Sequence, residues 1–315
     1  MTFTPNMKER PEKFAQIDEI ISEHLDTDSR IVKSINQGSM SSIFRVELGA
    51  DKSPLILKQY PQNARWRMEK ELRVYSALSE LKKVPSPDII KSSLDTEDSR
   101  IDFLLMSELP GNPLNQHELE VDETEHVFHE IGQMLRIIHS YTYDTFSRLD
   151  SGYSGEFATN KAFLESSINH AITELSQYDA GSALTRRIED FLYSELSSTP
   201  WPQQASLCHG DYNETNILIM REDDNWIVSG VIDVENAFAG DPAYDIAITE
   251  LSILTNDDVK KQAFLDGYGI NTTAIEDRVR FYKVLHTLRR HNWLIGKSKH
   301  KDSAELANEM ASLIT

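Results

Sequence analysis

The spacing of hydrophobic residues separates a front part of mixed elements from a rear part that is mostly helical. Apolar side chains recur at helical spacing over 11–25 and over 64–81, so each stretch predicts an amphipathic helix. Short β-prone runs within 31–58, near 89–90 and over 101–106 predict strands. We therefore expect the front part to be a small, β-rich lobe.

The rear part carries helical spacing over 122–140, 160–198 and 243–315. Its exception is 206–235, where short apolar runs joined by polar turns predict strands inserted among the helices. Strands and helices that are segregated in this way are typical of an α+β protein.

The pattern of hydrophobic residues therefore predicts two lobes. Gly111 and Pro113 interrupt it between the β-rich and the helical part. We expect a small N-terminal lobe over 1–106, a hinge over 107–115 and a larger, mainly helical C-terminal lobe over 116–315.

Composition narrows the class of protein. The chain has 315 residues, of which 39% are hydrophobic, and it has no apolar run long enough to span a membrane. The residues up to Pro11 are polar and lack the apolar core of a secretion signal. Cys208 is the one cysteine, which excludes an internal disulfide framework. We expect a soluble, cytoplasmic protein with no membrane partner.

The net charge is strongly negative and unevenly distributed. The formal charge at pH 7 is −19, and residues 111–275 hold 8 basic against 28 acidic side chains. This acidity argues against a nucleic-acid partner, because lysine and arginine supply the affinity for phosphates. A concentrated negative field can steer a cation into a cleft. Solubility, or adaptation to a saline habitat, explains the same surplus equally well.

The segment after the predicted strand at Leu207 carries the strongest chemical signal. Asp211 follows His209-Gly210, and Asn216 follows five residues later, directly before the apolar run 217–219. This spacing is that of a kinase catalytic loop. In such a loop the aspartate accepts the proton of the attacking hydroxyl, and the asparagine holds Mg²⁺ against the phosphates.

A second carboxylate stands at the end of the next apolar run. Asp233 follows Val231-Ile232, which is where kinases keep a second metal ligand, and it therefore pairs with Asn216. An isolated His-Gly-Asp is usually a turn, but here Gly240-Asp241-Pro242 and Asp245 follow in order. We expect structural roles for Asp241 and Asp245, either in capping a helix or in holding the catalytic loop.

Together these motifs resemble the aminoglycoside phosphotransferase and choline kinase family, whose fold is like that of protein kinases. The resemblance covers most of the chain, from about Ile31 to near Trp293. It implies that Asp211 is the catalytic base, that Asn216 and Asp233 are the Mg²⁺ ligands, and that the phosphoryl donor is ATP or GTP.

The N-terminal lobe contains residues that fit the nucleotide side of such a site. Lys58 ends an apolar run and fits the cation that holds the phosphates, and Glu71 fits its carboxylate partner better than Glu69 does. The position of 107–109 corresponds to the family's adenine-binding hinge, which implies backbone contacts from Ser107 and Leu109. The remaining phosphate contacts are assigned to a polar loop: Gly38, Ser39, Ser41 and Ser42.

The sequence departs from protein kinases at two points. Gly210 stands where they have an arginine that receives a phosphorylated activation loop, and Asp-Val-Glu replaces Asp-Phe-Gly. Both departures favour an unregulated kinase of small molecules.

The acceptor is predicted from the acidic surplus. Glu235 is the first candidate to bind a cationic amine, with Glu214 and Glu250 as further candidates. Three aromatic residues are candidates for a cage around a quaternary ammonium: Tyr244, Tyr282 and Trp293. We expect them to lie in the core instead.

We therefore predict a small-molecule kinase with ATP or GTP, Mg²⁺ and a cationic, aminoglycoside-like acceptor, acting as a monomer or weak homodimer. Choline, ethanolamine, amino sugars and other hydroxylated metabolites are alternatives within the same chemistry. A nucleotide-binding protein without catalysis and a protein kinase are alternatives of a different class.

Overall fold

The computed structural model describes the chain in several ranges: 31–37, 41–48, 52–95, 101–150, 152, 154–178, 182–255, 257–270 and 272–314. The helix expected over 11–25 and the loop residues Gly38 and Ser39 lie outside them. The chain forms two compact units, of which the first holds the residues up to Leu72 together with Pro87–Glu108. The second holds Arg73–Ser86 and the chain from Leu109 onward.

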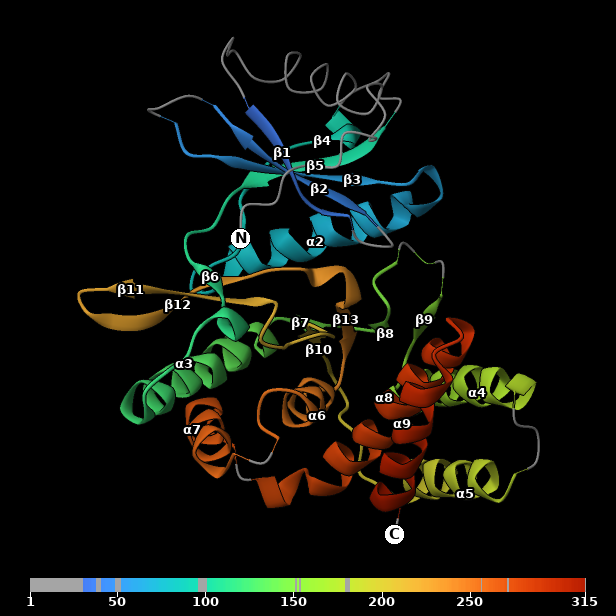
Figure 1. Cartoon of the computed structure of the whole chain (residues 1–315). Helices are drawn as coiled ribbons and strands as arrows, with labels where there is room; N and C mark the ends of the chain where they lie inside the picture. Colours follow the sequence, from blue (N-terminus) through green and yellow to red (C-terminus); the bar gives the residue numbers. More distant parts are fainter. Residues whose placement is uncertain are drawn as a thin grey trace. The chain divides into compact units, whose positions relative to one another are not determined.

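The first unit is built on an antiparallel five-stranded sheet with the order β1-β2-β3-β5-β4 (Figure 1). Its strands are β1 (Ile31–Gln37), β2 (Ser42–Glu47), β3 (Leu55–Tyr60), β4 (Ile89–Ser92) and β5 (Asp102–Ser107). The hydrophobic pattern predicted a strand in each of these places, and the structure confirms all five.

Alternation along these strands decides what each face of the sheet carries. A core cluster gathers every second residue of β2, β3 and β5, including Phe44, Val46, Leu55, Leu57, Phe103 and Leu105. Lys58 follows Leu57 and therefore points to the opposite face. There it meets Glu71 of α2 (Arg65–Leu81). The period of the strand thus places a cation on the face that carries α2.

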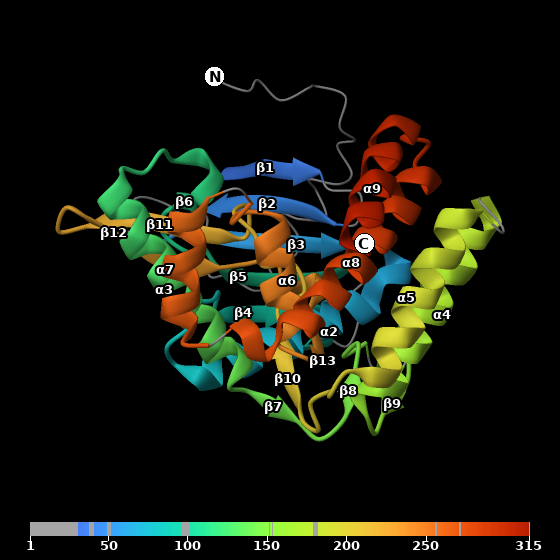
Figure 2. The same cartoon turned by 90° about the horizontal axis from the view of Figure 1, so that it is seen from below.

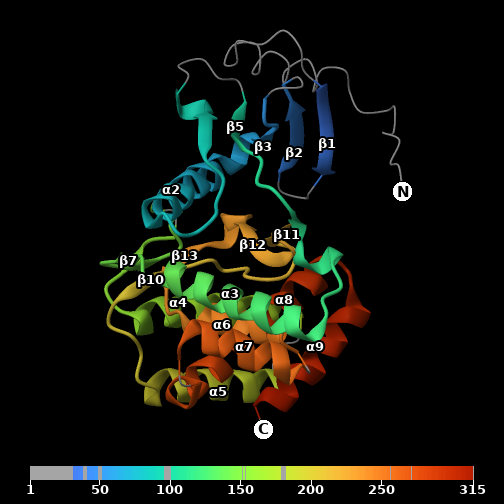
Figure 3. The ribbon, with the colours of Figure 1, turned by 90° about the vertical axis from the view of Figure 1, so that its left-hand side faces the viewer.

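The second unit is mainly helical, as the sequence predicted. Its helices are α3 (Val121–His139), α4 (Asn160–Tyr178), α5 (Ala183–Ser198), α6 (Ala243–Leu251), α7 (Asp258–Tyr268), α8 (Glu276–Gly296) and α9 (His300–Leu313). In Figures 2 and 3, α4 lies beside α5, α8 beside α9, and α3 beside α7. None of the helices described is long and apolar enough to cross a membrane.

Short strands are inserted among these helices. The three predicted within 206–235 are confirmed as β10 (Ala205–Cys208), β11 (Ile217–Glu222) and β12 (Asn225–Val231). Others were not predicted, because two or three residues are too short to show a period: β6 (Asn112–Pro113), β7 (Thr142–Tyr143), β8 (Phe146–Ser147), β9 (Glu156–Phe157) and β13 (Phe238–Gly240).

These strands form two sheets, with the orders β7-β10-β13-β8-β9 and β12-β11-β6. The loop that joins β10 to β11 connects the two sheets and contains the predicted catalytic motif. The segregated α+β arrangement expected from the sequence is confirmed.

Candidate active site

The loop after β10 takes its shape from Gly210. This residue has a φ of +80°, and a Cβ there would lie 2.1 Å from the backbone oxygen of Asn236. A side chain would be strained at such a φ and would collide with the backbone, so glycine is required for packing reasons. The departure from the arginine of protein kinases therefore has a local structural cause.

The carboxylate of Asp245, on α6, binds the backbone of this loop. Its side chain is fully buried, and its two oxygens accept hydrogen bonds from the backbone N–H groups of His209, at 2.6 Å, and Gly210, at 2.8 Å. Charge-assisted bonds of this kind are among the strongest in proteins. The expectation that Asp245 holds the catalytic loop is confirmed.

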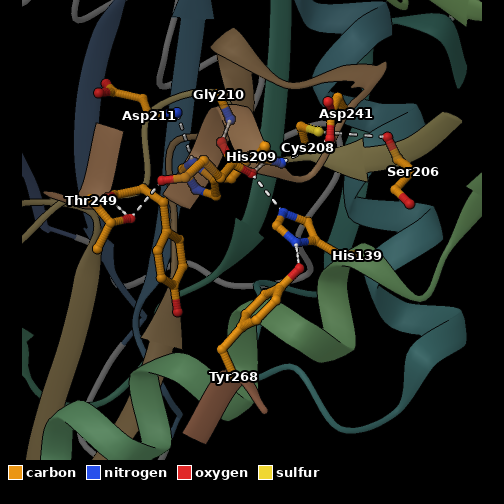
Figure 4. Close-up of polar contacts among 12 residues, drawn as sticks. His139, Ser206, Cys208, His209, Gly210, Asp211, Asp241, Thr249 and Tyr268 are labelled. Atoms are coloured by element: carbon orange, nitrogen blue, oxygen red, sulfur yellow. Dashed lines mark hydrogen bonds and ion pairs between the residues drawn. The ribbon is translucent and has the colours of Figure 1, made fainter. Parts of the chain in front are cut away.

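Asp245 is in turn supported by His139, which Figure 4 shows between the loop and Tyr268. His139, at the end of α3, places Nε2 3.0 Å from the Asp245 carboxylate and Nδ1 2.8 Å from the hydroxyl of Tyr268 on α7. Both nitrogens of a buried imidazole are thus engaged, and three helices fix the backbone of one loop. The carboxylate of Asp211 points away from this network.

Asp211 itself is held by two asparagines of the same loop. Asn213 Nδ2 donates to one carboxylate oxygen at 2.8 Å, and Asn216 Nδ2 donates to the backbone oxygen at 2.9 Å and the other carboxylate oxygen at 3.3 Å. Burial raises the pKa of Asp211, the charge of His209 opposes this, and the charge of Asp233 raises it further. A positioned carboxylate whose pKa is raised toward neutrality is a better proton acceptor than an ordinary aspartate.

Pairing of β11 with β12 brings Asn216 and Asp233 together. Ile217 pairs with Val231, and the N–H of Ile232 donates to the backbone oxygen of Asn216 at 3.0 Å. Asp233 adopts a left-handed conformation with a φ of 61°, and its N–H donates to the hydroxyl of Tyr75. Such a conformation is uncommon for a residue other than glycine and is concentrated at functional sites.

These two residues have the donor chemistry that Mg²⁺ requires. The Nδ2 group of Asn216 is turned toward Asp211, so its Oδ1 atom remains on the other side of the amide. An amide oxygen and a carboxylate oxygen are hard ligands, and Mg²⁺ usually combines one or two protein oxygens with water and phosphate oxygens. The residues present therefore fit the predicted metal.

Asp241 has the structural role expected from the sequence. Its Oδ1 atom accepts from the N–H of Ala243 at the start of α6 and from Arg278 of α8, both within 3.0 Å. The hydroxyl of Tyr282 donates to its other oxygen. Asp241 thus caps α6 and ties it to α8.

The predicted phosphate-binding residues lie in the first unit. Lys58 Nζ is 2.8 Å from the Glu71 carboxylate, and both side chains are almost completely buried. A buried ion pair fixes the position of the ammonium group, because either charge alone would be costly to bury. Ser41 precedes β2, and Ser42 is its first residue, paired with Gln59 of β3.

The expected hinge residues have different environments. The hydroxyl of Ser107 accepts a hydrogen bond from the N–H of Asp88, and the N–H of Ser107 donates to the Asp88 carbonyl. Leu109 belongs to the second unit, where its side chain packs against Gly230 of β12.

The three acidic candidates for acceptor binding also differ. Glu214 lies in the catalytic loop, and Glu235 lies in a short 3-10 turn after Asp233; both are half-buried. Glu250 of α6 forms ion pairs with Lys261, at 3.2 Å, and Lys283, at 2.5 Å. Two lysines already compensate its charge, so Glu250 offers little attraction to a cationic substrate.

The aromatic residues weighed for a cage do not gather around a common point. Tyr244 and Tyr282 are buried and pack edge to face, with ring centroids 5.6 Å apart. Trp293 is 55% exposed and lies under the ammonium group of Lys299 instead. The expectation of core residues is thus correct for the two tyrosines and wrong for Trp293, whose place on α8 faces outward.

Sequence reasoning missed the support that lies behind the loop. His139 and Tyr268 carry no motif, and they reach Asp245 only through the packing of α3 and α7 on α6. A histidine near the end of an amphipathic helix gives no signal that distinguishes it from a core residue.

Comparisons with known proteins agree with this geometry. Residues 31–282 match the family described as "Phosphotransferase enzyme family". No curated protein matches the chain. Among solved structures, aminoglycoside phosphotransferase APH(4)-Ia has a TM-score of 0.71 at 16% identity and covers 96% of this chain and 98% of its own. ADP-bound APH(2'')-Ib has a TM-score of 0.68 at 18% identity, covering 95% and 99%. A streptomycin–ATP complex of APH(2")-IIa has a TM-score of 0.67 at 16% identity, covering 99% of each chain.

Proposed function

Because the chain belongs to the phosphotransferase enzyme family, we propose that it transfers the γ-phosphoryl group of ATP or GTP to a hydroxyl group of a small molecule. In this proposal the first lobe (1–106) binds the nucleotide, 107–115 is the hinge, and the second lobe (116–315) carries the catalytic loop. The observation that carries it is the placement of Asp211 in the loop after β10, Asn216 directly before β11 and Asp233 after its partner strand β12, with the loop fixed by the buried Asp245 carboxylate.

The chemistry assigned to these residues is in-line displacement. The acceptor hydroxyl attacks the γ-phosphorus, its proton passes to Asp211, and the bond from the γ-phosphorus to the bridging oxygen breaks as the nucleoside diphosphate leaves. Lys58, held by Glu71, contacts the phosphates of the bound nucleotide. Asn216 and Asp233 would hold Mg²⁺, which neutralises charge on the phosphate oxygens.

The remaining nucleotide contacts come from the loop before β2 and from the hinge. We assign them to Gly38, Ser39, Ser41 and Ser42 on the phosphate side and to backbone groups of Ser107 and Leu109 on the adenine or guanine side. Structures of the relatives are described with ADP, AMP-PNP, ATP or GDP, which supports a purine nucleotide as the donor.

The acceptor is less constrained than the donor. The structures that resemble this chain are described with hygromycin B, kanamycin or streptomycin, but their identity to it is 13–18%. The acidic surplus favours an aminoglycoside-like cation, with Glu235 and Glu214 as its contacts. The groups closest to Asp211 are a better guide, because the reacting hydroxyl must lie within hydrogen-bond reach of the base.

The proposal is tested by a phosphorylation screen with ATP and with GTP, in the presence and absence of Mg²⁺. We expect transfer to at least one small-molecule hydroxyl, dependent on Mg²⁺ and lost in D233N. The matched control is D223N, which changes an exposed aspartate in the turn between β11 and β12 and should keep full activity. Transfer to peptides alone, or undiminished transfer by D233N, would contradict the proposal.

A further inference from the structure

Two arginines from distant segments lie close to Tyr244, beside the catalytic loop. Arg148 directly follows β8, where Ser147 pairs with Ala239 of β13. Arg148 interacts electrostatically with Tyr244, whose ring centroid is 4.9 Å from that of Phe238, the neighbour of Ala239 in β13. Phe238 in turn pairs with the last residue of β10, from which the catalytic loop starts.

The second arginine approaches Tyr244 from α8. Tyr282, His286 and Arg289 are spaced so that they share one face of this helix. The ring of Tyr282 lies 5.6 Å from that of Tyr244, and His286 Nδ1 lies 3.4 Å from the Tyr244 hydroxyl. Arg289 lies one turn further along, and its positive charge acts on Tyr244. We call Arg148, Tyr244, His286 and Arg289 the arginine cluster.

The carboxylates near Arg148 compensate its positive charge only in part. Within the ranges that the structure describes, neither Arg148 nor Arg289 forms an ion pair with a carboxylate, although both are half-buried. Asp150 and Glu174 attract Arg148 without forming an ion pair with it, and the repulsion by Arg289 is larger than either attraction. Asp150 accepts from the N–H and the hydroxyl of Ser154, and Glu174 pairs with His170 on the same helix.

The members of the cluster also affect one another electrostatically, and the charge of Asp211 reaches Tyr244. Burial lowers the pKa of Arg148, and the charge of Arg289 acts in the same direction. Burial raises the pKa of Tyr244; Arg289 opposes this, and the charge of Asp211 adds to it. Burial, with Arg290 and Arg289, lowers the pKa of His286 to about 3, so this imidazole is neutral at pH 7.

We propose that the arginine cluster binds an anionic group of the acceptor, so that the substrate carries a carboxylate or a phosphate in addition to the hydroxyl that is phosphorylated. The inference rests on the proposed function, since it assigns the acceptor side of the same site. Two guanidinium groups can each present parallel N–H donors to an oxyanion. A half-buried pair of like charges is unfavourable unless a ligand compensates it.

An anionic acceptor replaces the polycationic acceptor that the net charge suggested. The acidic side chains of 111–275 are spread over many elements, whereas both arginines act electrostatically on Tyr244, which the charge of Asp211 also reaches. A cationic group placed at the cluster would be repelled by both arginines. The two arginines therefore affect the choice of acceptor more strongly than the acidic surplus, which is spread over many elements and screened by salt.

The test is a panel of matched acceptors, used with the Mg²⁺–nucleotide complex and the full chain. Each anion is compared with its neutral counterpart, such as glycerate with glycerol and glucose 6-phosphate with glucose, and choline and kanamycin represent cations. We expect transfer to a carboxylate- or phosphate-bearing compound and at least ten-fold weaker use of its neutral counterpart. The two anionic arms distinguish a carboxylate from a phosphate.

Variants then link this preference to the cluster. R148Q and R289Q should each raise the KM of the anionic acceptor by about 10- to 100-fold, with little change in kcat or in nucleotide affinity. R290Q removes the same charge from the exposed neighbour on α8 and should change none of these values. The unfolding temperatures of R148Q and R289Q should equal or exceed that of the wild type, which separates a binding role from a structural one.

Two results would overturn the inference. One is preferred transfer to neutral or cationic compounds, and the other is an unchanged KM for the anionic acceptor in both variants. Failure of the proposed function has a different signature, because the wild type would then bind nucleotide without transferring phosphate to any compound in the panel.

Discussion

The two units of the molecule fix their predicted functional side chains in different ways. In the first unit, Lys58 forms an ion pair with the buried Glu71 carboxylate of α2. In the second unit, the loop that carries Asp211 is positioned through Asp245, which is itself held by residues of α3 and α7. A cation that contacts phosphate oxygens needs one fixed partner, whereas a base that must meet a reacting hydroxyl needs a fixed backbone.

The largest effect is expected from replacing Asp245, which holds the loop that carries Asp211. D245A leaves two buried N–H groups and the His139 imidazole without their acceptor, so we expect a loss of about 3–5 kcal/mol in the free energy of unfolding. Transfer should fall at least 100-fold. The control D190A removes an exposed aspartate of α5 and should change neither value by much. Chemical denaturation measures the stability and steady-state kinetics measure the transfer. Wild-type values for D245A in both would contradict the role of Asp245 in positioning the loop.

The local pair of the first unit should behave differently. K58M removes the ammonium group that pairs with the buried Glu71 carboxylate and should cost about 3 kcal/mol, whereas the double variant K58M/E71L should recover most of that loss. Transfer should stay at least 100-fold reduced in both variants, because neither has a cation for the phosphates. Recovery of transfer together with stability in the double variant would contradict the role given to Lys58.

His139 tests whether the support of Asp245 matters. H139Q keeps one polar contact to Asp245 but cannot also reach Tyr268 in the same geometry, so we expect a loss of about 1–2 kcal/mol. The kcat should fall several-fold while the nucleotide KM stays constant, since the loop would shift and Lys58 would not. A changed nucleotide KM with an unchanged kcat would argue against a loop-positioning role.

The contrast between the units also explains what the sequence could predict. Lys58 and Glu71 are 13 residues apart on neighbouring elements, and Asp211 with Asn216 forms a spaced motif, so both are visible along the chain. His139 lies 106 residues from Asp245 and 129 from Tyr268. Only the packing of helices brings them together, and no spacing rule connects them.

The acceptor side was the least accessible to sequence reasoning. The acidic total over 111–275 suggested a cation, because a sum over a segment treats exposed and buried charges alike. Arg148 adds a single charge to that sum and Arg289 lies outside the segment, yet both act electrostatically on Tyr244 in the folded chain. Glu250 shows the opposite case, since its charge counts in the sum although two lysines compensate it.

The smallest effect expected is a pH dependence of stability. The pKa of His286 is about 3 in the folded chain and about 6.5 when unfolded, so the unfolded state binds the proton more readily. Its contribution to stability is present above pH 6.5 and is lost as the pH falls toward 3. Between pH 7 and pH 5 the wild type should therefore lose about 1–2 kcal/mol more than H286Q. Equal losses in denaturant titrations at the two pH values would show that His286 is not shielded in this way.

The central claim is that Asp211 accepts the proton of the acceptor hydroxyl while the rest of the site binds the nucleotide. Single-turnover transfer of labelled γ-phosphate by D211N, at saturating Mg²⁺–nucleotide, tests it most directly. We predict a rate at least about 100-fold below that of the wild type, a nucleotide Kd within about two-fold of the wild-type value, and normal transfer by D223N. A transfer rate for D211N within ten-fold of the wild type would contradict the account.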